Sequence, residues 1–131
     1  MFSTKGRYAI RLMIDLAKRQ DDNYVALKDV ALSQDISKKY LEIIVKDLVE
    51  AGLLEGKPGK SGGYKLSRKP EDYTVAEILE IMEGTLAPVA CLEENAAPCP
   101  RASYCETLPM WKEFYDKISD FFYDKKISDL I

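Results

Sequence analysis

The sequence predicts a mainly α-helical protein that carries one small β-hairpin and ends in a long helix. Three observations lead to this fold class. Apolar residues recur at helical spacing in the first part of the chain, two short apolar stretches flank a turn-rich segment at residues 56–63, and an aromatic stripe runs along the last segment. With 131 residues, of which 47% are hydrophobic, the chain can build one compact core but not two.

Three short helices are predicted first. The first helix covers residues 4–20, a polar break follows at residues 20–23, and the second helix ends at residues 34–36. Ser37 is well placed to cap the third helix, which ends at Ala51-Gly52. The buried stripes are Ala9, Leu12, Met13 and Leu16, then Leu27, Val30 and Ala31, then Leu41, Ile44, Val45 and Leu48. Short helices separated by tight breaks indicate a helix-turn-helix core.

A β-hairpin is predicted after the third helix, because Leu53-Leu54 and Tyr64–Leu66 flank the turn-rich residues 56–63. Gly62 and Gly63 would let backbone N–H groups approach a phosphate closely. Cations are placed at the tip and base of the hairpin, namely Lys57, Lys60, Lys65, Arg68 and Lys69. A cationic hairpin that follows three helices is typical of a wing.

A fourth helix completes this first unit. Thr74 and Glu77 form a capping-box pattern at its start, and Gly84 stops it. Its apolar residues are Val75, Ile78, Leu79 and Met82. Residues 1–84 are therefore predicted to form a winged helix-turn-helix domain that binds DNA.

A loop and a long helix follow. Residues 85–106, the cysteine loop, are punctuated by proline and hold all three cysteines, so a sensory role is expected there. Residues 107–131 are expected to form a dimerisation helix and tail, opened by Thr107 and Pro109. One helix face carries Trp111, Phe114, Tyr115, Ile118, Phe121 and Phe122. The domain in front is too small to cover this surface, so the same helix of a second subunit is expected to do so, which predicts a homodimer.

The charge distribution supports two different partners. Residues 1–72 hold 14 Lys and Arg against 11 Asp and Glu, a net charge of +3, whereas residues 73–131 hold 5 against 11, a net charge of −6. The front half can contact phosphates, and the acidic rear half suits protein contacts. Apolar runs stay shorter than the roughly 20 residues of a membrane helix, and the start does not resemble a signal peptide. We therefore expect a soluble, cytoplasmic protein without a membrane partner.

Several short motifs occur in order along nearly the whole chain. They are Thr4-Lys5-Gly6-Arg7-Tyr8-Ala9, Asp35-Ile36-Ser37, Tyr40-Leu41-Glu42, Gly62-Gly63-Tyr64-Lys65-Leu66-Ser67-Arg68 and Glu83-Gly84. Together they resemble the Rrf2 family of bacterial transcription regulators. The resemblance implies a winged-helix domain and a long C-terminal helix that pairs two subunits. Members of that family include an iron–sulfur cluster regulator, a nitric-oxide-sensing repressor, an iron-responsive regulator and a cysteine metabolism repressor.

One departure from the family lies in the wing. Many relatives carry an Arg-Gly pair whose arginine enters the minor groove, whereas this chain reads Lys57-Pro58-Gly59. Proline stands at the arginine position, so the sequence does not support that readout here. Lys57 or Lys60 could supply charge at the tip without the same geometry.

The third helix is the expected recognition helix. Its exposed face presents Lys38, Lys39, Glu42 and Lys46, of which the lysines can reach phosphates or guanine edges. Glu42 can accept a hydrogen bond from a cytosine amino group, and the alternative is that it pairs with Lys38 or Lys46 on a solvated face.

Two further groups of residues are expected to contact the DNA backbone. Ser37, Lys39 and Tyr40 could anchor the start of the recognition helix on the backbone, although Tyr40 could simply pack. Thr4, Lys5 and Arg7 resemble the family's backbone-contacting N-terminus, and the alternative for them is a frayed end.

The cysteines Cys91, Cys99 and Cys105 have C-x7-C-x5-C spacing. A structural disulfide is not expected in a cytosolic protein, and zinc prefers four ligands at tighter spacing, for which the chain has no histidine. Loose spacing in a loop suits an iron–sulfur cluster better. The resemblance adds that cluster-binding branches carry three cysteines in this loop. In one branch a histidine three residues after the last cysteine is the fourth ligand of the cluster, and this chain has Leu108 at that position. Glu106 or a group of the partner subunit would have to supply the fourth ligand instead.

The cluster type stays open, with 2Fe–2S as one option. A thiol-based redox or metal sensor and a loop without sensory role are the alternatives to a bound cluster.

Other classes of function fit less well. A chain without histidine lacks the commonest general base, and it shows no nucleophile–base arrangement, so an enzyme is not expected. Gly59-Lys60-Ser61 is not a P-loop, because Leu54 stands where that motif needs glycine. The sequence thus predicts a transcription regulator that binds a two-fold operator in double-stranded DNA. The alternative is a thiol-controlled or partner-protein-controlled repressor of the cysteine metabolism type, in which the acidic rear half binds a protein.

Overall fold

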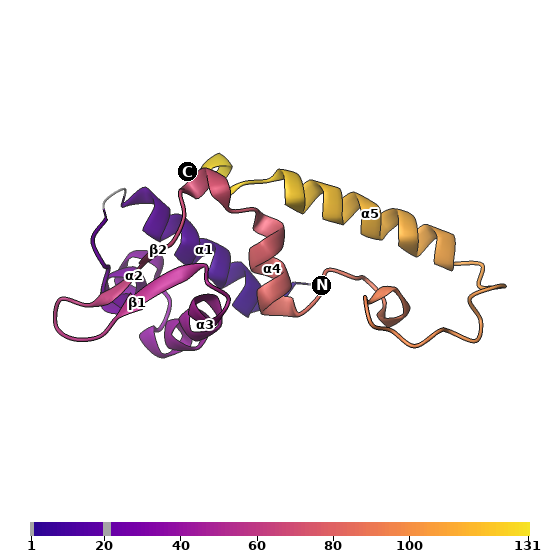
Figure 1. Ribbon diagram of the computed structural model, residues 1–131, viewed down its shortest axis with the longest axis horizontal. Helices are drawn as coiled ribbons and strands as arrows, with labels where there is room; N and C mark the ends of the chain where they lie inside the picture. The colour runs from indigo at the N-terminus through magenta and orange to yellow at the C-terminus, as the bar shows by residue number, and fades with distance from the viewer. Residues whose placement is uncertain (1, 20–21) are drawn as a thin grey trace.

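The computed structural model describes residues 2–19 and 22–131, so the predicted break at residues 20–23 lies partly outside the described residues. The elements follow one another in the predicted order (Figure 1). The helices are α1 (Thr4–Lys18), α2 (Leu27–Gln34), α3 (Lys38–Glu50), α4 (Val75–Glu83) and α5 (Leu108–Asp124), the strands are β1 (Leu54–Lys57) and β2 (Gly63–Leu66), and the short 3₁₀ helices are η1 (Pro70–Asp72), η2 (Ala90–Leu92) and η3 (Ile127–Leu130). The predicted fold class, mainly α with one small hairpin, is confirmed.

Local capping explains where the helices begin and end. Ser37 accepts a hydrogen bond from the N–H of Tyr40 at the start of α3, as predicted. Thr74 and Glu77 form the predicted capping box on α4, and Gly84 ends that helix with a positive φ of 86°. Asp35 ends α2 in the left-handed conformation, with φ of 54°.

The wing consists of β1 and β2, paired antiparallel in the register Leu54↔Leu66 to Lys57↔Gly63. The N–H of Val25 donates to the carbonyl of Tyr64 at 2.8 Å, and the N–H of Tyr64 donates back at 2.9 Å, which attaches the wing to the segment before α2. Gly63 has φ of 146°, and a Cβ there would collide with the Val25 carbonyl. This pairing therefore requires glycine at position 63.

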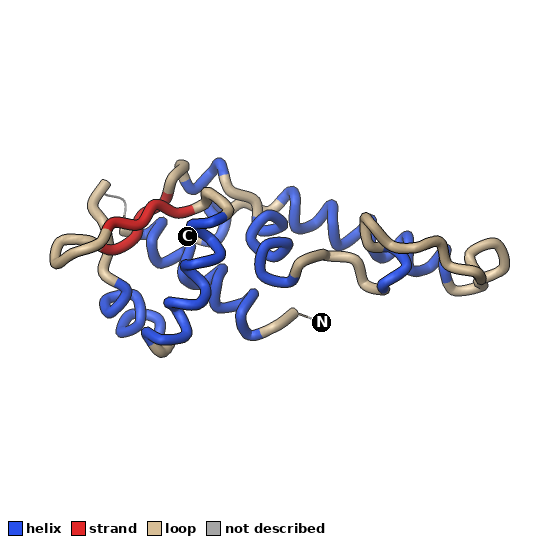
Figure 2. The backbone as a smooth tube through the Cα atoms, turned by 60° about the horizontal axis from the view of Figure 1, so that its bottom comes forward, coloured by secondary structure: helices blue, strands red, loops and turns tan. Residues whose placement is uncertain are grey.

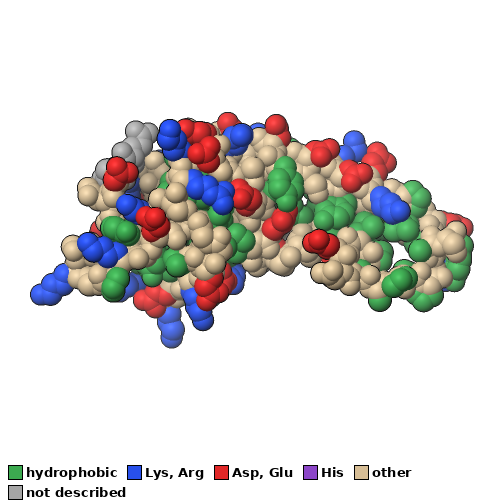
Figure 3. All heavy atoms as spheres, in the orientation of Figure 1, with side chains coloured by type: hydrophobic (Ala, Val, Ile, Leu, Met, Phe, Trp, Pro, Cys, Tyr) green, Lys and Arg blue, Asp and Glu red, His purple; other side chains and the backbone are tan. Residues whose placement is uncertain are grey.

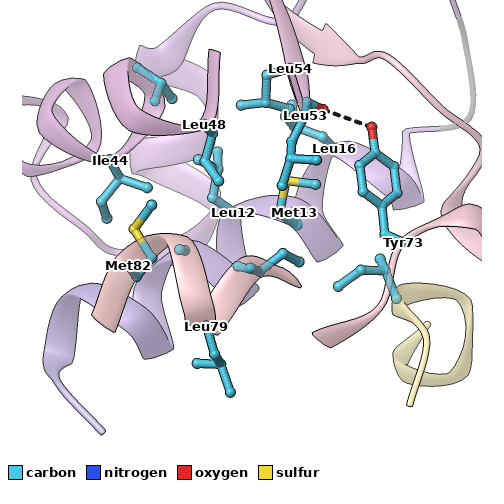
Figure 4. Packing of buried hydrophobic residues seen from close by; sticks show 14 of the residues in the cluster. Leu12, Met13, Leu16, Ile44, Leu48, Leu53, Leu54, Tyr73, Leu79 and Met82 are labelled. Atoms are coloured by element: carbon cyan, nitrogen blue, oxygen red, sulfur yellow. Dashed lines mark hydrogen bonds between the residues drawn. The ribbon is translucent and has the colours of Figure 1, made fainter. Parts of the chain in front are cut away.

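The core lies where α1, α3 and α4 meet behind the wing (Figure 4). The predicted stripe residues of these helices are buried, among them Leu12, Met13, Leu41, Ile44, Leu48 and Leu79. Tyr73, also fully buried, donates a hydrogen bond to the Leu53 carbonyl at 2.7 Å. One carboxylate, Asp15, is buried with them.

The buried carboxylate of Asp15 on α1 accepts hydrogen bonds from three side chains, two of which belong to α2. It accepts hydrogen bonds from Ser33 at 2.6 Å, Gln34 at 3.1 Å and Arg19 at 2.9 Å. Burial by itself raises the pKa of Asp15, but these hydrogen bonds and the Arg19 charge outweigh it and leave the pKa below its ordinary value. Asp15 is thus a charged cross-link within the helix-turn-helix core.

Helix α5 projects away from the winged domain, and the cysteine loop runs alongside it (Figure 2). No residue of α5 is buried, whereas Ile127 in the tail beyond it is fully buried in the core. The N–H of Val75 donates to the Lys125 carbonyl at 2.8 Å, and the N–H of Ile127 donates to the Tyr73 carbonyl at 3.2 Å. The segment 107–131 therefore has a projecting helix and a tail fixed to the winged domain.

None of the helices in the described part of the chain is both long and apolar enough to span a bilayer.

Candidate DNA interface and cysteine loop

The outer face of α3 carries the four residues predicted for it. Lys38, Lys39, Glu42 and Lys46 are exposed, opposite the buried stripe of the same helix. Within residues 2–19 and 22–131, no ion pair joins Glu42 to Lys38 or Lys46, so its carboxylate is available to a partner. Lysine and arginine side chains project from this end of the molecule and from the wing tip (Figure 3).

The start of α3 is held by packing and capping. Tyr40 is half-buried, and its ring lies against the ring of Tyr8 with centroids 5.5 Å apart. The guanidinium of Arg11 lies over the Tyr8 ring, 5.1 Å from its centroid. The Ser37 hydroxyl accepts from the Tyr40 N–H at 3.1 Å and keeps its own proton to donate. Tyr40 is thus placed by packing, and Ser37 retains a donor at the helix start.

The N-terminal turn of α1 is ordered by its cap. The Ser3 hydroxyl accepts from the Gly6 N–H at 3.0 Å, and Ser3 donates through its N–H at 2.9 Å and its hydroxyl at 2.6 Å to Glu83 Oε1. A Cβ at Gly6 would collide with the Glu83 carboxylate. The frayed-end alternative is therefore wrong, and α4 fixes this turn.

The three candidate residues of that turn differ in their surroundings. Thr4 and Arg7 are exposed, and Arg7 Nη2 donates to Thr4 Oγ1 at 3.3 Å. Lys5 Nζ instead lies 2.6 Å from Asp47 Oδ2 on α3. This ion pair ties the start of α1 to α3, so Lys5 is engaged within the protein.

Some of the basic side chains at the wing form ion pairs within the protein, and two lie over an aromatic ring. Lys65 pairs with Glu55 at 3.6 Å, and Arg68 pairs with Glu77 at 3.0 Å. The ammonium groups of Lys57 and Lys65 lie 5.7 and 4.9 Å from the centroid of the Tyr24 ring.

The tip of the wing is the part that projects. Lys57 and Lys60 are exposed, whereas Gly62 and Gly63 are half-buried at the start of β2. A Cβ at Gly62 would collide with the Lys57 carbonyl, so the hairpin needs glycine at position 62, as the pairing with Val25 needs it at position 63. A hollow of about 500 Å³ separates the wing from α3 and is lined by Glu42, Lys46, Val49, Lys57, Pro58 and Tyr64.

The three thiols of the cysteine loop are not grouped together in the structure. Cys91 is exposed in η2, and Cys99 and Cys105 are partly exposed with free thiols. In the described part of the chain, no three Cys, His, Asp or Glu side chains, Glu106 included, are grouped so that they could hold a metal ion. As arranged here, the three thiols do not fit an iron–sulfur cluster.

Cys105 has a distinct environment. Its Sγ lies 3.5 Å from Thr107 Oγ1 at the start of α5. Hydrogen bonds from the Thr107 side chain and backbone lower the pKa of the Cys105 thiol, with a smaller effect of the Arg101 charge. Thr107 thus gives the Cys105 thiol a hydrogen-bond partner at the start of α5.

The cysteine loop meets α4 and α5 across an acidic hollow of about 610 Å³. Glu80 and Glu83 of α4 face Glu93 and Glu94 of the loop there. Tyr123 donates a hydrogen bond to Glu80, and this bond together with burial raises the pKa of Tyr123 to about 12. Glu83, which accepts hydrogen bonds from Ser3, lines this hollow from the α4 side.

The six aromatic and aliphatic residues predicted for a dimer face are not all directed outward. Tyr115 and Phe122 pack against the chain's own core, and Phe122 meets Phe2 at 5.3 Å between ring centroids. Trp111 and Phe114 form a pair on α5, at 6.3 Å, and Phe121 is 57% exposed. Ile118 is half-buried. Trp111 and Phe114 are likewise half-buried, so Phe121 is the exposed one of the six predicted residues.

Sequence reasoning missed several residues of this region. Ile43 lies exposed on α3, and its place on the charged helix face could have been read from the spacing. Asp47 and Glu83, which hold Lys5 and Ser3, carry no local signal because their partners are distant in sequence.

Comparison with known proteins gives the family. The sequence matches the Rrf2 family profile, described as an iron-dependent transcriptional regulator, over residues 2–131. The chain belongs to the Rrf2 family. Among Rrf2 relatives, Protein rrf2 of Nitratidesulfovibrio vulgaris is 38% identical over 91% of this chain and 81% of its own. The HTH-type transcriptional regulator CymR of Bacillus subtilis is 37% identical over 87% and 82%, and IscR of Cereibacter sphaeroides is 35% identical over 98% and 85%.

Solved structures agree with this assignment. The structure of CymR, the global cysteine regulator of B. subtilis, superposes with a TM-score of 0.80 at 32% identity, covering 99% of this chain and 95% of that one. T. potens IscR gives a TM-score of 0.77 at 29% identity, covering 99% and 85%.

These findings confirm the resemblance and the winged-helix fold of this Rrf2 protein. The relatives are transcription regulators and not enzymes, so the chain is a DNA-binding transcription regulator. Relatives carry both names, CymR and IscR, so membership of the family does not by itself fix what the cysteine loop detects.

Proposed function

We propose that this Rrf2 protein acts in the cytoplasm as a homodimer that binds a two-fold operator, with α3 in the major groove and the wing on the flanking backbone. The observation that supports this best is the segregation of surfaces. The lysine side chains of α3 and the wing tip project from one end of the molecule, and α5 extends away from them toward the other end (Figures 1 and 3). A symmetric pair joined along α5 would carry two such cationic ends to two half-sites.

The contacts we propose follow from exposure. On α3, Lys38, Lys39 and Lys46 bind phosphates or guanine edges, and Glu42 accepts from a cytosine amino group. Ser37 donates to a phosphate at the helix start, where the helix dipole favours an anion.

Other candidates contact only the backbone or act within the protein. Thr4 and Arg7 lie at the surface beside α3, and Lys57 and Lys60 project from the wing, so all four are proposed phosphate contacts. Lys5 positions α3 through Asp47 and is not proposed as a phosphate contact. Gly62, Gly63 and Tyr40 shape the surface and are not proposed as direct ligands.

The dimer seam is proposed to consist of Trp111, Phe114, Ile118 and Phe121 and their counterparts in a second copy. Burial of aromatic side chains from two α5 helices would remove from water the surface that one chain leaves exposed. Tyr115 and Phe122 belong to the contact between α5 and its own winged domain.

The cysteine loop is proposed to be the sensor, with an iron–sulfur cluster held by Cys91, Cys99 and Cys105 as its occupant. The number of thiols and their loop position support this, and a fourth ligand from Glu106 or the partner subunit would be needed. The loop would have to fold around the cluster, because its thiols are apart in the present arrangement.

A second proposal is a cluster-free thiol switch or a repressor controlled by a protein partner. The lowered pKa of the Cys105 thiol favours thiol chemistry, and the similarity to CymR is consistent with it.

One experiment separates the two sensing proposals. The protein is purified without oxygen, and its absorbance, iron and sulfide are measured before and after reconstitution, with the triple variant Cys91→Ala, Cys99→Ala, Cys105→Ala as control. Charge-transfer bands with stoichiometric iron and sulfide, lost in the variant, support the cluster. Colourless protein that resists reconstitution, with operator affinity that responds to thiol oxidation, supports the thiol switch.

A further inference from the structure

Ile43 is an apolar residue on a charged surface. It lies in α3 four residues after Lys39 and directly after Glu42, and it is 54% exposed. The core contacts of α3 are made by Leu41, Ile44, Val45 and Leu48, so Ile43 is not needed for packing. Its neighbours on the outer face, Lys39, Glu42 and Lys46, are all exposed and charged.

The position of Ile43 matters more than its exposure, since single exposed apolar residues are common on proteins. Ile43 lies in the N-terminal half of the helix, the part that faces base edges when a recognition helix enters the major groove. Val49, the other exposed aliphatic residue of α3, is 37% exposed and lines the hollow toward the wing. Ile43 lies one turn after Lys39 and one turn before Lys46, whereas Val49 is the second-last residue of the helix.

Thymine is the base that an aliphatic side chain can recognise there. Its C5-methyl group is the single apolar group that the standard bases present in the major groove. Lysine and glutamate side chains read hydrogen-bonding groups and phosphates, and they gain little from a methyl group.

We infer that Ile43 is a specificity-determining residue that packs on a thymine C5-methyl group, next to the base read by Glu42. This inference rests on the proposed function, because it requires α3 to lie in the major groove. It predicts that each half-site contains a thymine whose methyl group contributes to affinity.

The test compares thymine with deoxyuridine, which lacks the methyl group and keeps the same hydrogen-bonding edge. An operator is first obtained by in vitro selection from random duplex DNA with the full-length protein, and each thymine is then replaced in turn. Loss of one buried methyl contact weakens binding by about fourfold, and loss from both half-sites by about fifteenfold. The wild-type protein should show this loss at one thymine position of each half-site.

The variants decide whether Ile43 is responsible. Ile43→Ala should bind the thymine and deoxyuridine operators equally well, whereas Val49→Ala, on the same helix, should keep the wild-type difference. Ile43→Ala should unfold close to the wild type, because more than half of its side chain is exposed, and urea unfolding of both variants checks that each is folded in the binding assay.

Two results would overturn the inference and leave the proposed function intact. One is wild-type binding that ignores deoxyuridine at every position, and the other is a deoxyuridine effect that persists in Ile43→Ala. Failure of the protein to select or bind any duplex would instead refute the proposed function, and the inference with it.

Discussion

Tyr73 joins the base of the wing to the helical core through one hydroxyl group. That hydroxyl donates to the Leu53 carbonyl at 2.7 Å and accepts from the N–H groups of Ser67 and Arg68 at 2.9 Å each. Tyr73 is fully buried, and Leu53 is 1% exposed. The substitution Tyr73→Phe removes the oxygen and leaves the ring, so it isolates these bonds together with a longer contact of 3.4 Å to the Ser67 hydroxyl.

The expected loss follows from what can replace each bond. Ser67 and Arg68 lie at the surface, so water can satisfy their N–H groups, whereas the Leu53 carbonyl is left with a long contact of 3.5 Å from the Ser67 N–H. A buried acceptor without a good donor costs about 1–3 kcal/mol. We therefore expect Tyr73→Phe to lower the free energy of unfolding by about 2 kcal/mol.

Urea unfolding at equal protein concentrations measures this loss, because a dimer's stability depends on concentration. Tyr104→Phe is the matched control, since Tyr104 is 60% exposed in the cysteine loop, and its change should stay within about 0.5 kcal/mol. Equal midpoints for Tyr73→Phe and Tyr104→Phe would refute the reasoning that this hydroxyl fixes the wing base. Operator affinity of folded Tyr73→Phe should also fall, because the wing loses its anchor.

Three further predictions concern the termini of α1 and α5 and the buried carboxylate. Gly6→Ala should displace the Glu83 carboxylate from Ser3, lowering the free energy of unfolding by about 1 kcal/mol and weakening operator binding. When Gly6→Ala is combined with Glu83→Ala, the two losses of unfolding free energy should be less than additive. Full additivity would contradict the contact. Because the pKa of Asp15 is lowered on folding, its stabilising effect is complete above its ordinary pKa near 3.8 and is lost as the pH falls below that value. Asp15→Asn should therefore reduce the loss of stability with falling pH in this range of the acid unfolding curve, whereas the exposed Asp116→Asn should not. Identical curves for the two variants would exclude the effect. Phe121→Glu should raise the dimer dissociation constant about tenfold or more in sedimentation experiments, because two charges would enter the proposed apolar seam. Lys112→Glu, on the exposed side of α5, should leave the dissociation constant unchanged. A Phe121→Glu dimer as stable as the wild type would show that this face of α5 is not the interface.

Local signals in the sequence predicted the elements of this fold well. Ser37, Thr74 with Glu77, and Gly84 act over three or four residues, so their capping could be read directly and is confirmed. The buried stripes of α1, α3 and α4 followed from helical spacing for the same reason.

Pairings between distant residues could not be predicted in this way. Nothing near Lys5 indicates that Asp47 neutralises it, and the Val25 carbonyl that requires Gly63 to lack a side chain belongs to another segment. Helical spacing placed Tyr115 and Phe122 on the predicted dimer face, but the tail returns to the winged domain and draws this side of α5 against the chain's own core.

The cysteine loop shows the same limit of sequence patterns. The spacing of Cys91, Cys99 and Cys105 gives their order in the loop and not their distances in space. In the described part of the chain the three thiols are not grouped for a metal ion, and the spacing along the sequence could not show this.

The salt dependence of operator binding tests most directly the claim that α3 and the wing bind DNA as a symmetric pair. In a dimer, the double variant Lys39→Ala, Lys60→Ala removes four proposed phosphate contacts, so the slope of log affinity against log salt should become shallower by about 3.6. The matched double variant Lys112→Ala, Lys117→Ala on exposed positions of α5 should keep the wild-type slope. An unchanged slope in the first variant, or the same change in both, would contradict the proposed interface.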